Sequence, residues 1–119
     1  MANSRERWRD VGYGSIACGD YVSAVDAFAQ AGETKLLYNL GTFLIAKTDD
    51  VDLARKAYKL ALNSEQEDVL KTELEQLMEQ EYKVQNNGRD PKTLTRLNTL
   101  IEVIVDIIRG RWESEKEAS

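Results

Sequence analysis

Few residues in this chain of 119 residues could do chemistry, and histidine is absent. Histidine is the side chain that most often transfers protons near neutral pH and most often binds transition metals. Carboxylates, lysine and tyrosine can also act in catalysis, but only where several polar groups converge on one point. No such cluster can be identified in the sequence, which therefore favours a protein that is not an enzyme.

Three short motifs resemble chemical sites and lack essential parts. Residues 12–14 read Gly-Tyr-Gly, but no Gly-Lys-Ser follows them and no strand precedes them, as a phosphate-binding loop requires. Residues 49–52 lack the spaced ligands, the central glycine and the closing glutamate of a calcium loop. Cys18 has no basic neighbour to activate it, so we expect a small buried apolar residue there.

One helical face in the second half of the chain is rich in carboxylates, which Glu73, Glu79 and Glu81 provide. Helical bundles that hold two metal ions carry such carboxylates, but they combine them with Glu-x-x-His pairs. Because the chain has no histidine, we predict neither a metal site nor a cofactor.

The overall charge argues against nucleic acid as a partner. Sixteen basic and 21 acidic residues give a net charge of −5, so the chain lacks the general attraction to phosphates on which nucleic-acid binding rests. Hydrophobic residues make up 42% and charged residues 31%. This balance is typical of a soluble folded protein, and the length fits a single domain over residues 1–119.

The location follows from three further features. No stretch reaches the ~20 apolar residues that a membrane span needs. The N-terminus lacks the apolar core of a secretory signal. A single cysteine excludes an internal disulfide and fits a reducing compartment. We therefore expect a cytoplasmic protein.

Helical periodicity runs through most of the chain, which contains only one proline. It predicts an all-α fold with helices at about 4–17, 21–31, 34–47, 51–62, 65–84 and 91–112, and an acidic, frayed tail at 113–119. Gly19 and Gly32 are expected as left-handed stops. Asp20 and Asp90 are expected as helix caps, and Ser64 with Glu67 as a capping box.

The apolar spacing indicates which side chains point inward. The expected inward residues include Trp8, Val11, Ile16, Val22, Leu70, Leu74, Leu77, Met78 and Tyr82. The stretch 100–108 is rich in β-branched residues, but no second strand is available to pair with it. Its three-four spacing therefore favours a helix.

The first half of the chain contains two matched blocks. Gly12 corresponds to Gly41 at a shift of 41 − 12 = 29 residues. Ala24, Phe28 and Ala31 correspond to Ala54, Tyr58 and Ala61 at a shift of 30 residues. We expect the two glycines to let helices cross closely, with Ala24 and Ala54 opposite them. Phe28 and Tyr58 are expected to fill the gap toward the next hairpin.

In these residues the chain resembles the tetratricopeptide repeat (TPR) family, in which Leu-Gly on one helix is followed by Ala-x-x-x-Phe on the next. The resemblance covers residues 5–63 and implies three antiparallel hairpins in a right-handed superhelical stack. Ser15 and Leu44 replace the family's aromatic residue, and the closing proline is missing. Residues 64–112 lack the signature, so they are interpreted as a third helix pair or as capping helices.

The resemblance also implies a groove lined by the first helix of each repeat. The residues at the groove positions are Glu6, Arg9, Tyr13, Lys35, Tyr38, Asn39 and Thr42. Some members of the family bind a C-terminal carboxylate there, but the third repeat's Lys-x-x-x-Arg pair is missing and Glu6 adds negative charge. We therefore expect a protein-interaction module such as an adaptor, co-chaperone or assembly factor, which binds a protein or peptide segment without the complete carboxylate clamp.

The last helix is apolar over more than half of its circumference, and such a helix must be covered on two sides. Its candidate contact residues are Leu97, Ile101, Ile104, Val105, Ile108 and Trp112. It could be buried in a compact bundle, fold into the groove, pair with its counterpart in a homodimer, or dock on a partner. The last two outcomes define an alternative function, a structural subunit of a homodimer or a heteromeric complex.

Overall fold

The computed structural model describes residues 4–88 and 90–118, with side chains to residue 114, and folds them into six helices without a strand. The helices are α1 (Ser4–Ala17), α2 (Tyr21–Ala31), α3 (Thr34–Lys47), α4 (Val51–Leu62), α5 (Glu67–Asn87) and α6 (Pro91–Ala118). This confirms the all-α class. The expected frayed tail is wrong for residues 113–118, because α6 runs through Gly110 and continues to Ala118.

Local caps explain most of the helix ends. Gly32 takes a left-handed conformation at φ 69° after α2, and the amide of Ser23 donates to the carboxylate of Asp20 at 3.2 Å. The expected capping box at Ser64 is wrong, because Gln66 precedes α5 and makes no side-chain cap hydrogen bond. The chain completes another turn after α4, in which the amide of Glu65 donates to a carbonyl of α4 at 3.0 Å, and this turn leaves Ser64 too far from α5.

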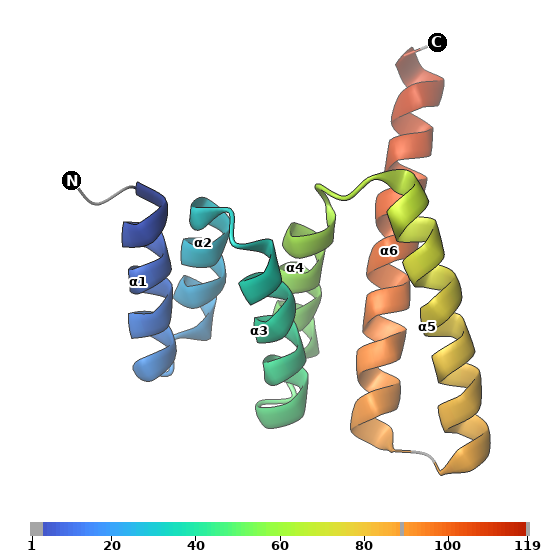
Figure 1. Cartoon of the computed structure of the whole chain (residues 1–119), viewed down its shortest axis with the longest axis horizontal. Coiled ribbons are helices and arrows are strands. Elements are labelled where there is room, and N and C mark those ends of the chain that lie inside the picture. The colour runs from blue at the N-terminus through green and yellow to red at the C-terminus, as the bar shows by residue number, and fades with distance from the viewer. Residues whose placement is uncertain (1–3, 89, 119) are drawn as a thin grey trace.

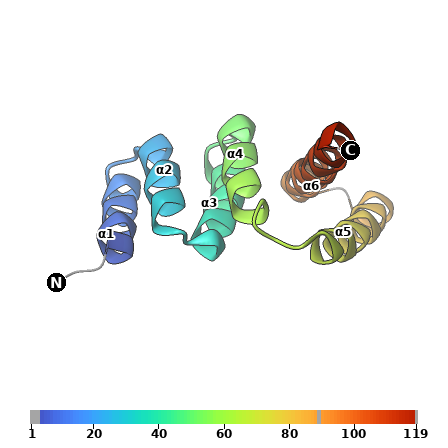
Figure 2. The same cartoon turned by 90° about the horizontal axis from the view of Figure 1, so that it is seen from above.

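Consecutive helices pack in pairs, α1 on α2, α3 on α4 and α5 on α6 (Figure 1). Seen from above, α1, α3 and α5 lie along one side of a plate, and α2, α4 and α6 lie along the other (Figure 2). The Cα extents of 48 × 45 × 19 Å describe a flat molecule. Its radius of gyration of 15.7 Å exceeds the about 13.5 Å of a compact domain of this length. Much of the helix surface is therefore open.

Each repeat glycine lies under an aromatic ring of its own helix pair. A Cβ atom on Gly12 would lie 2.6 Å from Cδ1 of Phe28, and one on Gly41 would lie 2.8 Å from Cε1 of Tyr58. These rings were expected to fill the gap toward the next hairpin, and the structure places each of them against the glycine of its own helix pair. Each ring can lie this close to the neighbouring helix because glycine has no Cβ atom. Each glycine and its ring therefore form one packing unit, in which neither can be changed without affecting the other.

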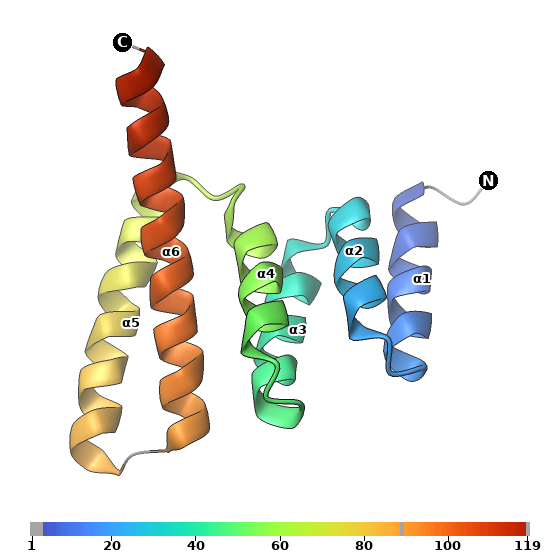
Figure 3. The same cartoon turned by 180° about the vertical axis from the view of Figure 1, so that it is seen from behind.

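The third helix pair is joined to the rest through α6. Figure 3 shows α6 between α5 and α4, and α6 packs on α3, α4 and α5. Its most buried side chains are Leu97, Leu100, Val103, Ile104 and Ile107. An ion pair of 2.7 Å between Arg55 and Glu102 joins α4 to α6 at the surface. The inner part of the apolar arc of this helix is thus covered within the chain.

Five of the side chains expected to point inward, and Cys18, are instead exposed. The exposed fractions are 43% for Trp8, 49% for Val11, 55% for Val22, 57% for Met78 and 70% for Tyr82. For α5 the reason is that this helix packs chiefly on α6, so only one narrow stripe is covered. For α1 the reason is its place at the end of the plate, where α2 is its main neighbour.

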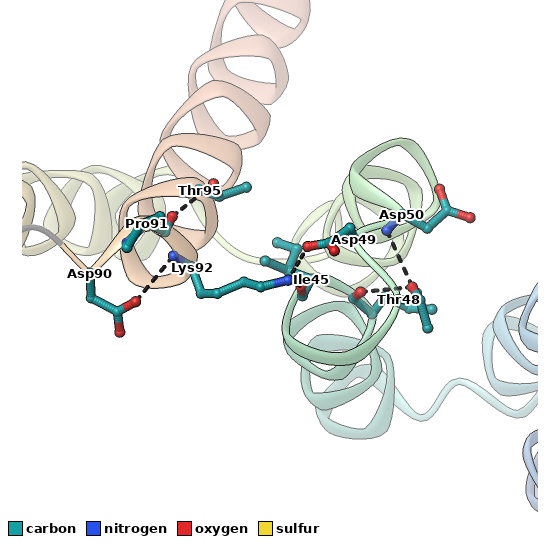
Figure 4. A network of polar contacts seen from close by, with 9 residues as sticks. Ile45, Thr48, Asp49, Asp50, Asp90, Pro91, Lys92 and Thr95 are labelled. Atoms are coloured by element: carbon teal, nitrogen blue, oxygen red, sulfur yellow. Dashed lines mark hydrogen bonds and ion pairs between the residues drawn. The ribbon is translucent and has the colours of Figure 1, made fainter.

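A polar clasp fixes the start of α6 against the turn between α3 and α4 (Figure 4). The ammonium group of Lys92 donates to the carbonyl of Ile45 at 3.2 Å and to the carboxylate of Asp49. Asp49 has a positive φ of 57°, a conformation that aspartate tolerates better than most residues. The clasp therefore connects the second and third helix pairs by one side chain.

Replacing Lys92 by methionine should lower the free energy of unfolding by about 1 kcal/mol. The ion pair with Asp49 is largely exposed and contributes little, so most of the loss should come from the bond to the Ile45 carbonyl. Urea denaturation followed by circular dichroism measures the difference. Asp49→Asn is the matched control, because it keeps the backbone conformation and removes only the charge. If Asp49→Asn lowered the free energy of unfolding as much as Lys92→Met, the ion pair and not the bond to the Ile45 carbonyl would provide most of the stabilisation.

Candidate binding groove

A groove opens between α3 and the first half of α5. Because α6 is the helix that packs on α4, the start of α5 is held away from α3. The hollow encloses about 360 Å³. Its lining residues are Thr34, Lys35 and Tyr38 from α3, Ala61 and Leu62 from α4, Glu65 from the connecting turn, and Val69, Leu70 and Glu73 from α5.

The groove has an apolar floor and one exposed apolar wall. Leu70 and Ala61 are buried at 0% and 2% exposure, and they continue the core of the protein to the floor of the groove. Val69 keeps 48% of its surface exposed on the α5 wall. Tyr38 is half-buried on the α3 wall, where its ring meets that of Tyr58 edge-on at 5.2 Å. An apolar side chain of another molecule could therefore pack on this floor, between Val69 on α5 and Tyr38 on α3.

The two rims carry opposite charges. Lys35 stands on the α3 rim, and Glu65 and Glu73 stand on the side of α5. Burial raises the pKa of the Tyr38 hydroxyl, the negative charge of Glu73 adds to this, and Arg96 opposes it. Tyr38 therefore offers the groove a neutral hydroxyl at pH 7, which can form hydrogen bonds.

Tyr58 supports the groove from below. Burial raises its pKa to about 12, although the hydrogen bond with Thr42 acts in the opposite direction. The two hydroxyls are 2.8 Å apart, so the predicted groove residue Thr42 is engaged with Tyr58 beneath the wall. The packed ring of Tyr58 supports the ring of Tyr38 from the side of α4.

Of the seven residues predicted for a groove, the structure brings Lys35 and Tyr38 to this one. Glu6, Arg9 and Tyr13 lie on α1 and do not line it. Arg9 lies 3.9 Å from the carboxylate of Glu33, which also accepts a hydrogen bond from Arg5 at 3.0 Å.

The remaining predicted residues take no part in the groove lining. Tyr13 lies against Phe28, with ring centroids 5.4 Å apart, and Asn39 is exposed on α3. The clamp-like pair of Arg9 and Asn39 therefore does not line this groove.

The sequence pattern missed the groove residues of α5. Val69 lies outside the apolar stripe formed by Leu70, Leu74 and Leu77. An apolar residue beside this stripe was the one feature of the sequence that could have indicated the α5 wall of the groove. The sequence pattern relates Glu73 to carboxylate-rich helical bundles and not to a groove. Glu79 is paired with Lys83 at 3.2 Å, and no group of three acidic or cysteine side chains in residues 4–88 and 90–114 could hold a metal ion.

The residues predicted for a contact surface on α6 do not form one exposed face. Leu97 and Ile104 have no exposed surface. Ile101, Val105 and Ile108 are half-buried, and Trp112 is 57% exposed. Within the described part of the chain, no helix is long and apolar enough to cross a membrane.

No protein-family model matches this chain, and no curated protein or solved structure matches it either. The likeness to the TPR family therefore rests on the repeat residues alone. Function has to be inferred from the geometry of the fold and of the groove.

Proposed function

We propose that this protein is a non-enzymatic interaction module that holds a segment of a partner protein in the groove between α3 and α5. The observation that carries the proposal is the groove itself, an open hollow with a core-supported apolar floor and charged rims. In the TPR-like interpretation of residues 5–63, such a module acts as an adaptor, a co-chaperone or an assembly factor.

The chemistry of the lining indicates what kind of segment would fit. The apolar floor accepts an aliphatic or aromatic side chain, whose removal from water supplies most of the affinity. Lys35 favours an acidic group on the α3 side, and Glu65 and Glu73 favour a basic group on the α5 side. A peptide with an apolar anchor between charges of opposite sign meets all three requirements.

Two variants on one helix test the proposal. Val69→Asp places a charge on the groove wall, and Met78→Asp places the same charge elsewhere on α5, where the side chain is 57% exposed. Neither position is buried, so both variants should keep the helicity of the parent chain. Partners captured by the tagged wild-type protein, identified by mass spectrometry, should also be captured by Met78→Asp and reduced at least tenfold with Val69→Asp.

Lys35→Glu provides a second test from the opposite rim. It should weaken capture of the same partners, because it removes the positive charge that faces Glu65 and Glu73 across the groove. If both groove variants capture the partners as well as Met78→Asp does, the groove is not the binding site.

A further inference from the structure

The two matched blocks differ in how they are covered. Leu37 and Leu40 on α3 are buried at 2% and 4% exposure, and α2 packs on this helix. Trp8 and Val11 stand at the same positions of α1, 29 residues earlier. They are 43% and 49% exposed, and with Ser4 and Arg7 they line a shallow hollow. Among the described residues, the face of the helix that packs on α2 in the second block is therefore left open in the first.

Gly14 marks the same open face. Its counterpart at a shift of 29 is Phe43, whose ring contacts that of Tyr21 on α2 at 5.6 Å. A Cβ atom on Gly14 would meet nothing within 4 Å, whereas the absence of a Cβ on Gly12 makes room for Phe28. A glycine inside a helix is unfavourable relative to alanine, and Gly14 leaves a space that no described residue of this chain fills.

We propose that this face of α1 binds the same face of a second copy of the chain, with the two helices antiparallel and crossing at Val11. At 100° per residue, positions 4, 8, 11, 15 and 18 share one side of the helix. With a two-fold axis beside Val11, residues of the two copies lie opposite each other when their numbers add up to about 22. Such a contact is self-complementary, as a dimer with two-fold symmetry requires.

The residue sizes match this pairing. Trp8 of one copy lies opposite Ser15 of the other, and Arg7 lies opposite Gly14, so each large side chain meets a small one. A parallel arrangement would instead place Arg7 beside Arg7 and Trp8 beside Trp8, which costs like-charge repulsion and leaves the space at Gly14 empty. The open face therefore fits an antiparallel copy of itself.

The size of the face predicts a weak dimer. A helix of 14 residues is about 21 Å long. A contact along one such helix buries less than the about 1,200–2,000 Å² of stable protein complexes. We therefore expect reversible association that depends on protein concentration, and a covalent trap is the sharpest way to detect it.

The natural Cys18 provides that trap. The antiparallel pair brings position 4 of one copy to Cys18 of the other, so Ser4→Cys should form two disulfides across the dimer under mild oxidation. Within one chain the two positions are about 21 Å apart along the helix, far beyond the Cα separation of about 4–7 Å that a disulfide spans. In the wild-type dimer the two Cys18 residues lie at opposite ends and should not be linked.

The matched control is Gln76→Cys, which places an exposed second cysteine on α5. Ser4→Cys should give the covalent dimer at least tenfold faster than Gln76→Cys, and adding Val11→Glu should remove that difference. In sedimentation equilibrium, the wild-type chain should associate with rising concentration, and Val11→Glu should stay monomeric with unchanged circular dichroism. Equal cross-linking of the two cysteine variants, cross-linking that Val11→Glu does not slow, or a wild-type chain that stays monomeric at millimolar concentration would overturn the proposal.

Discussion

Replacing Tyr58 by alanine is expected to lower the free energy of unfolding by about 3–5 kcal/mol, the usual cost of truncating a buried aromatic residue. Tyr58 has no exposed surface. Its ring covers Gly41, supports the ring of Tyr38 and holds the hydroxyl of Thr42. The truncation therefore opens a cavity between α3 and α4 directly below the groove. Guanidinium denaturation followed by circular dichroism at 222 nm gives the difference.

Tyr58→Phe separates the ring from its hydroxyl. It keeps the packing and removes only the bond to Thr42, so the expected loss is about 1 kcal/mol. The Thr42 hydroxyl already lies 3.4 Å from the carbonyl of Tyr38 and can donate to it instead. If Tyr58→Phe were as damaging as Tyr58→Ala, the hydroxyl and not the ring would hold this region together.

Gly41→Ala tests whether glycine and ring act as one unit. Alone it forces a methyl group into the Tyr58 ring, at a cost of about 1–3 kcal/mol. In the Tyr58→Ala background the ring is gone, and the better helix propensity of alanine should make the same change neutral or stabilising by up to about 1 kcal/mol. A cost that is equal in both backgrounds would contradict the contact.

The helix boundaries could be predicted because their causes are local. Gly32 ends α2 through its own left-handed backbone, and Asp50 caps α4 by accepting from the amide of Leu53 at 3.1 Å. Pro91 begins α6 because its ring already has the helical φ. Ser64 failed as a cap because one more turn of chain separates it from α5, and the sequence pattern carries no signal for that turn.

The groove could not be predicted because it depends on which of two helices packs on α4. Both α5 and α6 carry apolar stripes, and only the folded chain shows that α6 takes the inner place. This choice buries Ile104, leaves Val69 exposed and opens the hollow beside Tyr38. Trp8 is exposed for a related reason, since α2 is the main neighbour of α1 among the described helices. Lys35 and Tyr38 were predicted for a groove, and both line this one because they stand on α3.

Replacing Ile104 by glutamate is expected to cost about 4 kcal/mol or more and to unfold a large share of the protein. Ile104 has no exposed surface and lies in the main core on the helix that joins the second and third pairs. Ile104 is surrounded by the apolar side chains of the core, so the new carboxylate would be removed from water there. Thermal and urea unfolding of the purified variant measure the loss.

The result also decides between two roles of α6. If this helix belonged to a partner interface, Ile104→Glu would leave the isolated protein stable and abolish only association. Val105→Glu is the matched control. Val105 is half-buried, so the new charge can reach water. The free energy of unfolding should therefore fall by only about 1 kcal/mol. Where Ile104→Glu gives no folded protein, Ile104→Ala should still unfold measurably, with a loss of about 2–5 kcal/mol. A normal unfolding curve for both Ile104 variants would show that α6 is not part of the core, and the seating of the third helix pair, with the groove that depends on it, would have to be abandoned.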